Sequence, residues 1–156
     1  GSELEKLQKL SHKLGLTGKI TWKGAQSQKG VFEAYENSDL FIMPSIIATD
    51  GDRDGLPNVL MEAASKKVCC IATDLPGITE FIRHDETGWI VPSKNSKELT
   101  RSIISLSQDP AKRVRLAESA NKLLATHFSH SKNVQDIIKL LKSDLDRNND
   151  VIQDSI

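Results

Sequence analysis

The chain has 156 residues, enough for one domain with a hydrophobic core that needs no disulfides. Its 21 basic and 21 acidic residues balance, so the charge gives no indication of a nucleic-acid or anionic-membrane partner. A hydrophobic content of 38% and a charged content of 27% are typical of a globular chain. The adjacent Cys69 and Cys70 would point to opposite faces of a strand, which predicts two buried thiols in a reducing compartment. Every apolar stretch is far shorter than the about 18 residues that a membrane-spanning helix needs.

The first half of the chain alternates between helical and strand-like patterns. Four leucines at helical spacing predict a helix over 3–14, which Gly15 ends. Alternating apolar residues predict a strand over 19–24, with Trp22 in the core. The next predicted elements are a short helix over 31–37, a buried strand over 39–44 and a helix over 57–67.

The second half begins with a continuous apolar run at 68–73, which is typical of a strand covered on both faces. A polar tail follows at 146–156. Between them the patterns predict a brief helix over 78–84, a short strand over 88–92 with Trp89 in the core, and helices over 96–108, 110–128 and 131–145.

Strands and helices alternate about every 20 to 25 residues, which predicts right-handed βαβ crossovers. We therefore expect an α/β fold with a Rossmann-like, doubly wound parallel sheet followed by C-terminal helices. One domain would cover 1–145 and the tail 146–156. Ligands bind such sheets outside the carboxyl ends of the strands. The loops expected to carry function are 24–30, 44–56, 73–77 and 91–95.

The segment DGDRDGLPNVLME, residues 50–62, at first suggests a calcium-binding EF-hand loop, because three alternate aspartates precede Gly55. Counted from Asp50, however, the twelfth position is Met61, and Glu62 comes one residue late. On a helix, one residue is a rotation of about 100 degrees, so this carboxylate would point away from the ion. The preceding segment is also strand-like rather than helical. We therefore exclude the EF-hand interpretation.

Counted from Asp54, the same segment predicts a different site. With Pro57 as the first helical residue, Asn58, Glu62 and Ser65 share the exposed face of the helix. The helix N-terminus at Gly55–Pro57 offers free N–H groups and a dipole that favour an anion.

One carboxylate thus lies on each side of a helix start whose N–H groups can donate hydrogen bonds. This arrangement suits a ligand with hydroxyl groups at both ends and phosphate in the middle. A nucleotide-activated sugar is such a ligand. The alternative is that Asp54 caps the helix and Glu62 is an ordinary solvated charge. From the spacing alone, this plainer alternative is favoured.

A resemblance to a known family extends over residues 44–92, from PSIIATDGDRDGLPNVLMEA through CCIATDLPGITEFI to ETGWIVP. This region is similar to the signature of glycosyltransferase family 4, the group 1 retaining transferases of the GT-B fold. The two acids of that signature, eight residues apart, correspond to Asp54 and Glu62. The similarity continues through KITWKGA, SDLFIMPS and the helix after Pro110, and so covers most of the chain. The other matching positions are Gly55, Pro57, Leu60, Ala63, Ala72, Thr73, Gly77 and Glu80.

The resemblance implies roles for several residues of the chain. Asp54 is the catalytic residue, which orients the donor sugar and stabilises an oxocarbenium-like transition state, and Glu62 hydrogen-bonds the nucleotide ribose. The donor is a nucleotide-diphosphate sugar, and neither a metal ion nor another cofactor is expected. Besides Glu62, the implied substrate-binding residues are Gly55, Leu56, Pro57 and Asn58 at the sugar and phosphate, and Gly24, Ala25 and Gln26 at the nucleobase.

The implied function is that of the donor-binding, C-terminal half of a retaining hexosyltransferase, whose acceptor is a glycan or a lipid-linked sugar. The acidic insertion before GLPNVLMEA resembles members that build bacterial surface polysaccharides. We expect a cytoplasmic location, with peripheral membrane contact through an acceptor domain. The alternatives are a non-transferring relative such as a nucleotide-sugar epimerase, and a non-catalytic nucleotide-binding module.

The chain also departs from the family pattern. Asp54 stands where the family has Glu, and Lys66, Lys67 and Cys69 replace residues of its Gly and Pro-Val motif. The family's diphosphate-binding Arg and Lys, and its acceptor domain, would precede Gly1. We therefore expect an N-terminally incomplete donor half that is inactive alone.

Overall fold

The computed structural model describes residues 3–47 and 55–128. The chain divides into two compact units, residues 1–31 and 32–156. The predicted helix over 131–145, the tail over 146–156 and the boundary between them lie outside the described residues. Among the helices of the described part, none combines the length and the apolar character that crossing a membrane requires.

The first unit contains α1 (Leu4–Lys13), which confirms the helix predicted from the leucine spacing. Gly15 follows it with φ +67°, a left-handed conformation that favours glycine. The strand predicted over 19–24 is wrong, as is the core position of Trp22, which is 40% exposed. An alternating pattern forms a strand only when another strand satisfies its backbone N–H and C=O groups. No described strand pairs with this segment.

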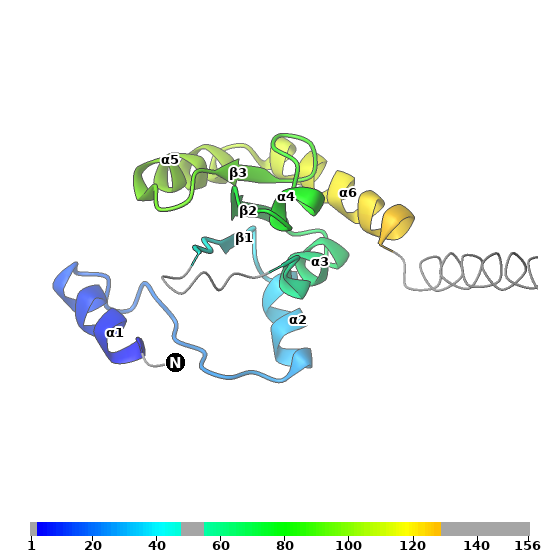
Figure 1. The fold of residues 1–156 in the computed structure, drawn as a ribbon. Coiled ribbons are helices and arrows are strands. Elements are labelled where there is room, and N and C mark those ends of the chain that lie inside the picture. Colours follow the sequence, from blue (N-terminus) through cyan, green and yellow to red (C-terminus); the bar gives the residue numbers. More distant parts are fainter. Residues whose placement is uncertain (1–2, 48–54, 129–156) are drawn as a thin grey trace, which may run out of the picture. The chain divides into compact units, whose positions relative to one another are not determined.

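The larger unit contains a parallel sheet of three described strands, in the order β1-β2-β3 (Figure 1). Leu40 pairs with Cys69, and Ile71 pairs with Trp89. All five residues of β2 are buried, as the continuous apolar run predicts. The strands are β1 (Leu40–Met43), β2 (Cys69–Thr73) and β3 (Trp89–Val91).

Helices precede, connect and follow these strands, which confirms the α/β alternation (Figure 1). The side chain of Asn95 caps α5 by accepting from the N–H of Glu98 at 3.0 Å, and Asp109 caps α6 by accepting from the N–H of Lys112 at 2.9 Å. The helices are α2 (Gln28–Glu36), α3 (Asn58–Ser65), α4 (Ile78–Phe81), α5 (Ser96–Ser107) and α6 (Pro110–His127).

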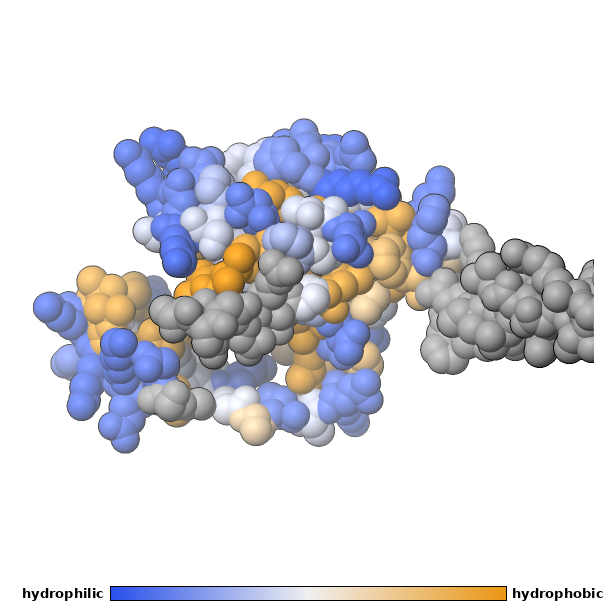
Figure 2. All heavy atoms as spheres, viewed as in Figure 1, coloured by the Kyte–Doolittle hydropathy of each residue, from blue (hydrophilic) through white to orange (hydrophobic). Residues whose placement is uncertain are grey.

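The two faces of the sheet have separate apolar layers. Cys69 and Ile71 face a cluster formed with α5 and α6, which includes Leu106 and Leu116. On the opposite face, the rings of Tyr35 from α2 and Phe41 from β1 pack in a T-shaped contact, with ring centroids 5.4 Å apart. The visible surface of the larger unit is mostly polar and charged, with hydrophobic patches between the helices (Figure 2).

The two cysteines are free and buried, as predicted. Burial raises the pKa of Cys69 to about 11 and that of Cys70 to about 12. Because the thiolate is the reactive form of cysteine, both residues act as small apolar side chains of the core.

Candidate functional site

The N-terminus of α3 lies directly after a proline. Pro57 is extended, with φ −68° and ψ 126°, and it is the N-cap, so the helix begins at Asn58, one residue later than predicted. The Pro57 carbonyl accepts from the N–H of Leu60 at 3.1 Å, which makes it the half-helical flanking residue. Pro57 has no side-chain group that could cap the helix. The N-cap residue therefore leaves the N–H groups of Asn58 and Val59 without a side-chain cap of its own.

A glycine contact fixes the loop before this helix. A Cβ atom on Gly77 would lie 2.7 Å from both the carbonyl carbon and the carbonyl oxygen of Gly55, and 3.2 Å from the backbone nitrogen of Leu56. Gly77 also has φ +85°, which disfavours any side chain. Only glycine fits here, so the loop after β2 supports the chain where it turns into α3.

Three of the predicted functional loops meet at the carboxyl edge of the sheet. The hydroxyl of Thr73 donates to the carbonyl oxygen of Ser45 at 2.8 Å, which joins the loops after β2 and β1. Asp74 joins the loops after β2 and β3. Its N–H donates to the carbonyl oxygen of Val91 at 3.1 Å, and its Oδ1 accepts from the N–H of Ser93 at 2.7 Å. The sequence-based choice of these loops is thus consistent with their observed positions.

Glu62 lies on the open side of α3. Together with Asn58, Met61 and Ser65 it lines a shallow depression of about 320 Å³. This confirms that Asn58, Glu62 and Ser65 share one face. On the other side of the helix, Leu60, Ala63 and Ala64 are fully buried. The half-buried carboxylate of Glu62 therefore stands one turn beyond the first residues of the helix.

Tyr35 is a neighbour of Glu62 that sequence reasoning missed. Burial is the largest cause that raises its pKa to about 12, followed by the negative charge of Glu62, with smaller contributions from Cys70 and from a side-chain hydrogen bond to Glu62. The phenol is consequently neutral at physiological pH. No local sequence pattern could indicate this pair, because packing of α2 against α3 brings it together.

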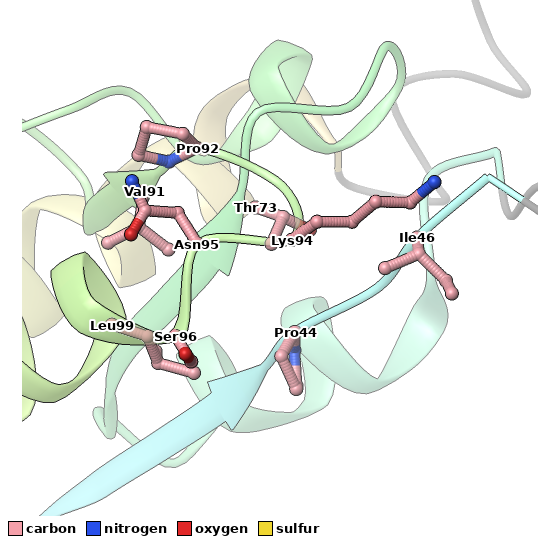
Figure 3. Close-up of a pocket in the computed structure, with 9 residues that line it drawn as sticks. All are labelled: Pro44, Ile46, Thr73, Val91, Pro92, Lys94, Asn95, Ser96 and Leu99. Carbon is pink, nitrogen blue, oxygen red and sulfur yellow. The ribbon is translucent and has the colours of Figure 1, made fainter.

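A cavity at the carboxyl ends of the strands does not include Glu62. It holds about 200 Å³, less than the about 300 to 1,000 Å³ of typical ligand pockets. Figure 3 shows Lys94 extended across its mouth on the side of Ile46. The lining residues come from the carboxyl ends of all three strands and from the start of α5: Pro44, Ile46, Thr73, Val91, Pro92, Lys94, Asn95, Ser96 and Leu99.

The remaining predicted site residues have different outcomes. Asp54 lies outside the described residues. Gly55 and Asn58 are exposed, and Leu56 and Pro57 are half-buried, all at the start of α3. Gly24, Ala25 and Gln26 are exposed residues of the first unit, where the Gln26 side-chain amide donates to the carbonyl oxygens of Lys23 and Ala25.

Within residues 3–47 and 55–128, no three acidic, histidine or cysteine side chains gather where they could hold a metal ion. The prediction of metal-free chemistry stays a prediction.

Sequence comparisons identify similar proteins. The sequence model of a family described as "Glycosyl transferases group 1" matches residues 1–123. The amylovoran biosynthesis glycosyltransferase AmsK of Erwinia amylovora is 29% identical over 119 residues, 76% of the chain and 29% of the relative. The lipopolysaccharide core biosynthesis glycosyltransferase LpsE of Rhizobium meliloti is 29% identical over 143 residues, 92% of the chain and 40% of the relative. The chain thus spans well under half the length of these relatives.

Solved structures share the fold. The C-terminal domain of a glycosyl transferase group 1 family protein from Francisella tularensis has a TM-score of 0.71 at 22% identity, over 83% of the chain and 64% of that domain. Anabaena HepE in complex with UDP has a TM-score of 0.80 at 21% identity, over 90% of the chain and 36% of that protein. The predicted α/β fold is confirmed.

Proposed function

Because the chain belongs to the glycosyl transferases group 1 family, we propose that it supplies the nucleotide-sugar site of a retaining hexosyltransferase. The acceptor is a glycan or a lipid-linked sugar of a bacterial surface polysaccharide, and a further domain binds it. Relatives named for amylovoran, colanic acid and lipopolysaccharide core biosynthesis support this assignment.

One observation carries the proposal: Glu62 stands on the open face of α3, one turn from a helix N-terminus that its N-cap residue leaves uncapped. The N–H groups at the start of α3 face the diphosphate, where the helix dipole favours negative charge. Glu62 accepts hydrogen bonds from the ribose hydroxyls. A carboxylate suits that role because it offers about four acceptor sites and no donor.

The other parts of the site come from the motif. Asp54 lies beside the donor sugar and stabilises positive charge that develops at the anomeric carbon. By resemblance to the family, Gly24–Gln26 is assigned to the nucleobase. No metal ion takes part, because basic groups of the protein and backbone N–H groups neutralise the diphosphate.

Calorimetric titration of the chain with UDP and GDP up to millimolar concentration tests the proposal. These two nucleotides are chosen because HepE was solved with UDP and a mycobacterial relative is named GDP-mannose-dependent. We expect saturable binding of one of them, and Glu62→Ala should weaken it about 10-fold or more, since hydrogen bonds to a charged group are worth about 1.5 to 3 kcal/mol. Unchanged affinity in Glu62→Ala would rule out the ribose assignment.

A further inference from the structure

The cavity at the carboxyl ends of the strands, here the Lys94 cavity, has mostly apolar walls (Figure 3). Its volume of about 200 Å³ is too small for a whole nucleotide sugar, because pockets for drug-sized ligands hold about 300 to 1,000 Å³. The cavity therefore fits one end of a larger ligand. Its walls come from prolines and aliphatic side chains: Pro44, Ile46, Val91, Pro92 and Leu99.

The polar side chains at the mouth of the cavity can donate hydrogen bonds. Lys94 pairs with no carboxylate in the described part of the chain, and the Ser96 hydroxyl has no partner there. Asn95 uses its Oδ1 to accept from the N–H of Glu98 at 3.0 Å, which leaves its NH₂ group to donate. None of the described lining residues is acidic. The mouth therefore suits an anion.

The backbone on both sides of Lys94 is fixed. The N–H of Ser93 donates to Asp74 Oδ1 at 2.7 Å, and Asn95 is the N-cap of α5. Lys94 itself has φ +59°, a left-handed conformation that a lysine adopts less readily than a glycine or an asparagine. The lysine is thus held beside the cavity, at the start of a 12-residue helix whose dipole also favours negative charge.

Apolar walls and a cationic mouth together select an amphiphilic anion. Sugar hydroxyls that enter hydrocarbon walls lose hydrogen bonds to water and find no replacement. A hydrocarbon chain gains affinity instead, about fourfold for each methylene that it buries. Phosphate is an anion that lysine binds as a point charge. The chemistry of the cavity therefore matches a lipid phosphate better than a glycan.

We propose that the Lys94 cavity is the subsite for the lipid end of the acceptor: Lys94, Asn95 and Ser96 bind the phosphate of a lipid phosphate, and the apolar walls enclose the first carbons of its chain. This inference rests on the proposed function, and it selects the lipid-linked sugar over the glycan as acceptor. The further domain then binds the acceptor's sugar. The cavity and the start of α3 both lie at the carboxyl edge of the sheet, so donor and acceptor meet on one side of the larger unit.

Titration of the ¹⁵N-labelled chain with ethyl, butyl, hexyl and octyl phosphate, each below its micelle-forming concentration, tests the inference. We expect amide shift changes at residues 91–99. The affinity should rise about fourfold per methylene until the cavity is full and then level off. Inorganic phosphate and 1-hexanol each lack one half of the amphiphile and should bind at least about tenfold more weakly than hexyl phosphate. Saturation with UDP or GDP should leave these results unchanged, because the nucleotide binds at α3.

Two variants separate the contributions of charge and chain. Lys94→Asn removes the ammonium group but keeps a residue type that tolerates the left-handed backbone. It should weaken all alkyl phosphates by the same factor, about threefold to tenfold. Ile46→Ala shortens one wall, and the fold should tolerate it because Ile46 is 53% exposed. It should reduce the gain per methylene and leave the affinity for ethyl phosphate nearly unchanged.

Lys97→Gln is the matched control. Lys97 is an exposed lysine of α5 that does not line the cavity, so this variant removes the same charge from the same helix. It should change neither the affinity nor its dependence on chain length.

Three outcomes would overturn the inference. The affinity could be independent of chain length, which is the behaviour of a site for phosphate alone. Glucose 1-phosphate could bind as tightly as hexyl phosphate, which would favour a glycan. Lys97→Gln could weaken binding as much as Lys94→Asn. Each of these leaves the proposed function intact if UDP or GDP still shifts residues 55–62. A failure of the wild-type chain to bind either nucleotide overturns the proposed function and the acceptor role of the cavity with it.

Discussion

At the level of single residues, two thiols and one phenol in the described part of the larger unit keep their protons because they are buried. Burial raises the pKa of Cys69 and Cys70, and burial together with the Glu62 charge raises that of Tyr35. Arg113 opposes the shift at Cys69 but does not cancel it. These groups therefore contribute to folding in their neutral forms.

This predicts a pH dependence of stability. In the unfolded chain the groups ionise near their ordinary values of 9.0 and 10.0, while in the folded chain Cys70 and Tyr35 keep their protons to about 12. The unfolded state loses protons first, so the free energy of unfolding is fully present below about pH 9 and falls as the pH rises toward about 12. Denaturant unfolding at a series of alkaline pH values measures the slope.

Cys70→Ala should reduce the alkaline slope because it removes one of these protons, although it also lowers stability at neutral pH by leaving a small cavity. Ser102→Ala, which removes no group that titrates in this range, should lower stability without changing the slope. An equal slope in wild type and Cys70→Ala would contradict this interpretation of the buried thiols.

Residue-level prediction succeeded where local periodicity decides the answer. Glu62 was placed on the open face of α3 from helical spacing, and Cys69 and Cys70 were placed in the core from the apolar run. Tyr35 was not found, because its partners Val59 and Glu62 come from another helix and only tertiary packing reveals them.

At the level of elements, α3 ends in a common helix-terminating turn in which a lysine occupies the position that usually holds glycine. The N–H of Val68 donates to the carbonyl oxygen of Ala63 and that of Lys67 to Ala64, both at 3.0 Å, which is a Schellman motif. Lys67 is the C′ residue of this motif and has φ +55°, a left-handed conformation that glycine adopts without steric cost. The family motif has Gly at this position, and the left-handed conformation of the C′ residue explains that preference.

Lys67→Gly should therefore stabilise the chain by about 0.5 to 1 kcal/mol. The strain energy that glycine relieves in the folded chain exceeds the free energy lost because glycine gives the unfolded chain more conformational freedom. Thermal unfolding measures the change. Lys67→Ala is the matched control, since it removes the same charge but keeps the Cβ atom that causes the strain. If Lys67→Ala raised the free energy of unfolding as much as Lys67→Gly, the cause would be the lost charge and not the backbone conformation.

Element prediction failed at 19–24, and the comparison with 68–73 explains why. Both segments have a strand-like pattern, but β2 pairs with a strand on each side, whereas 19–24 pairs with none of the described strands. Side-chain pattern is a local property, and a strand's hydrogen bonds come from distant parts of the chain. Helices such as α1 and α6 satisfy their own backbone and were predicted almost to the residue.

At the scale of the whole molecule, the candidate site lies at the carboxyl edge of a parallel sheet, where the α/β alternation predicts ligands. The sequence predicts which loops meet there, but not the contact between Gly77 and Gly55 that fixes the start of α3, although both glycines match the motif. It also does not predict the small cavity at Lys94, whose lining residues come from three separate segments.

We expect a nucleotide to bind along the Glu62 face of α3. Amide chemical shifts of the ¹⁵N-labelled chain, recorded while UDP or GDP is added, test it most directly because they locate even weak binding residue by residue. We expect the largest changes on residues 55–62 and on the supporting loop at 73–77. Changes confined to the Lys94 cavity, at residues 91–99, or no changes at millimolar nucleotide, would contradict it.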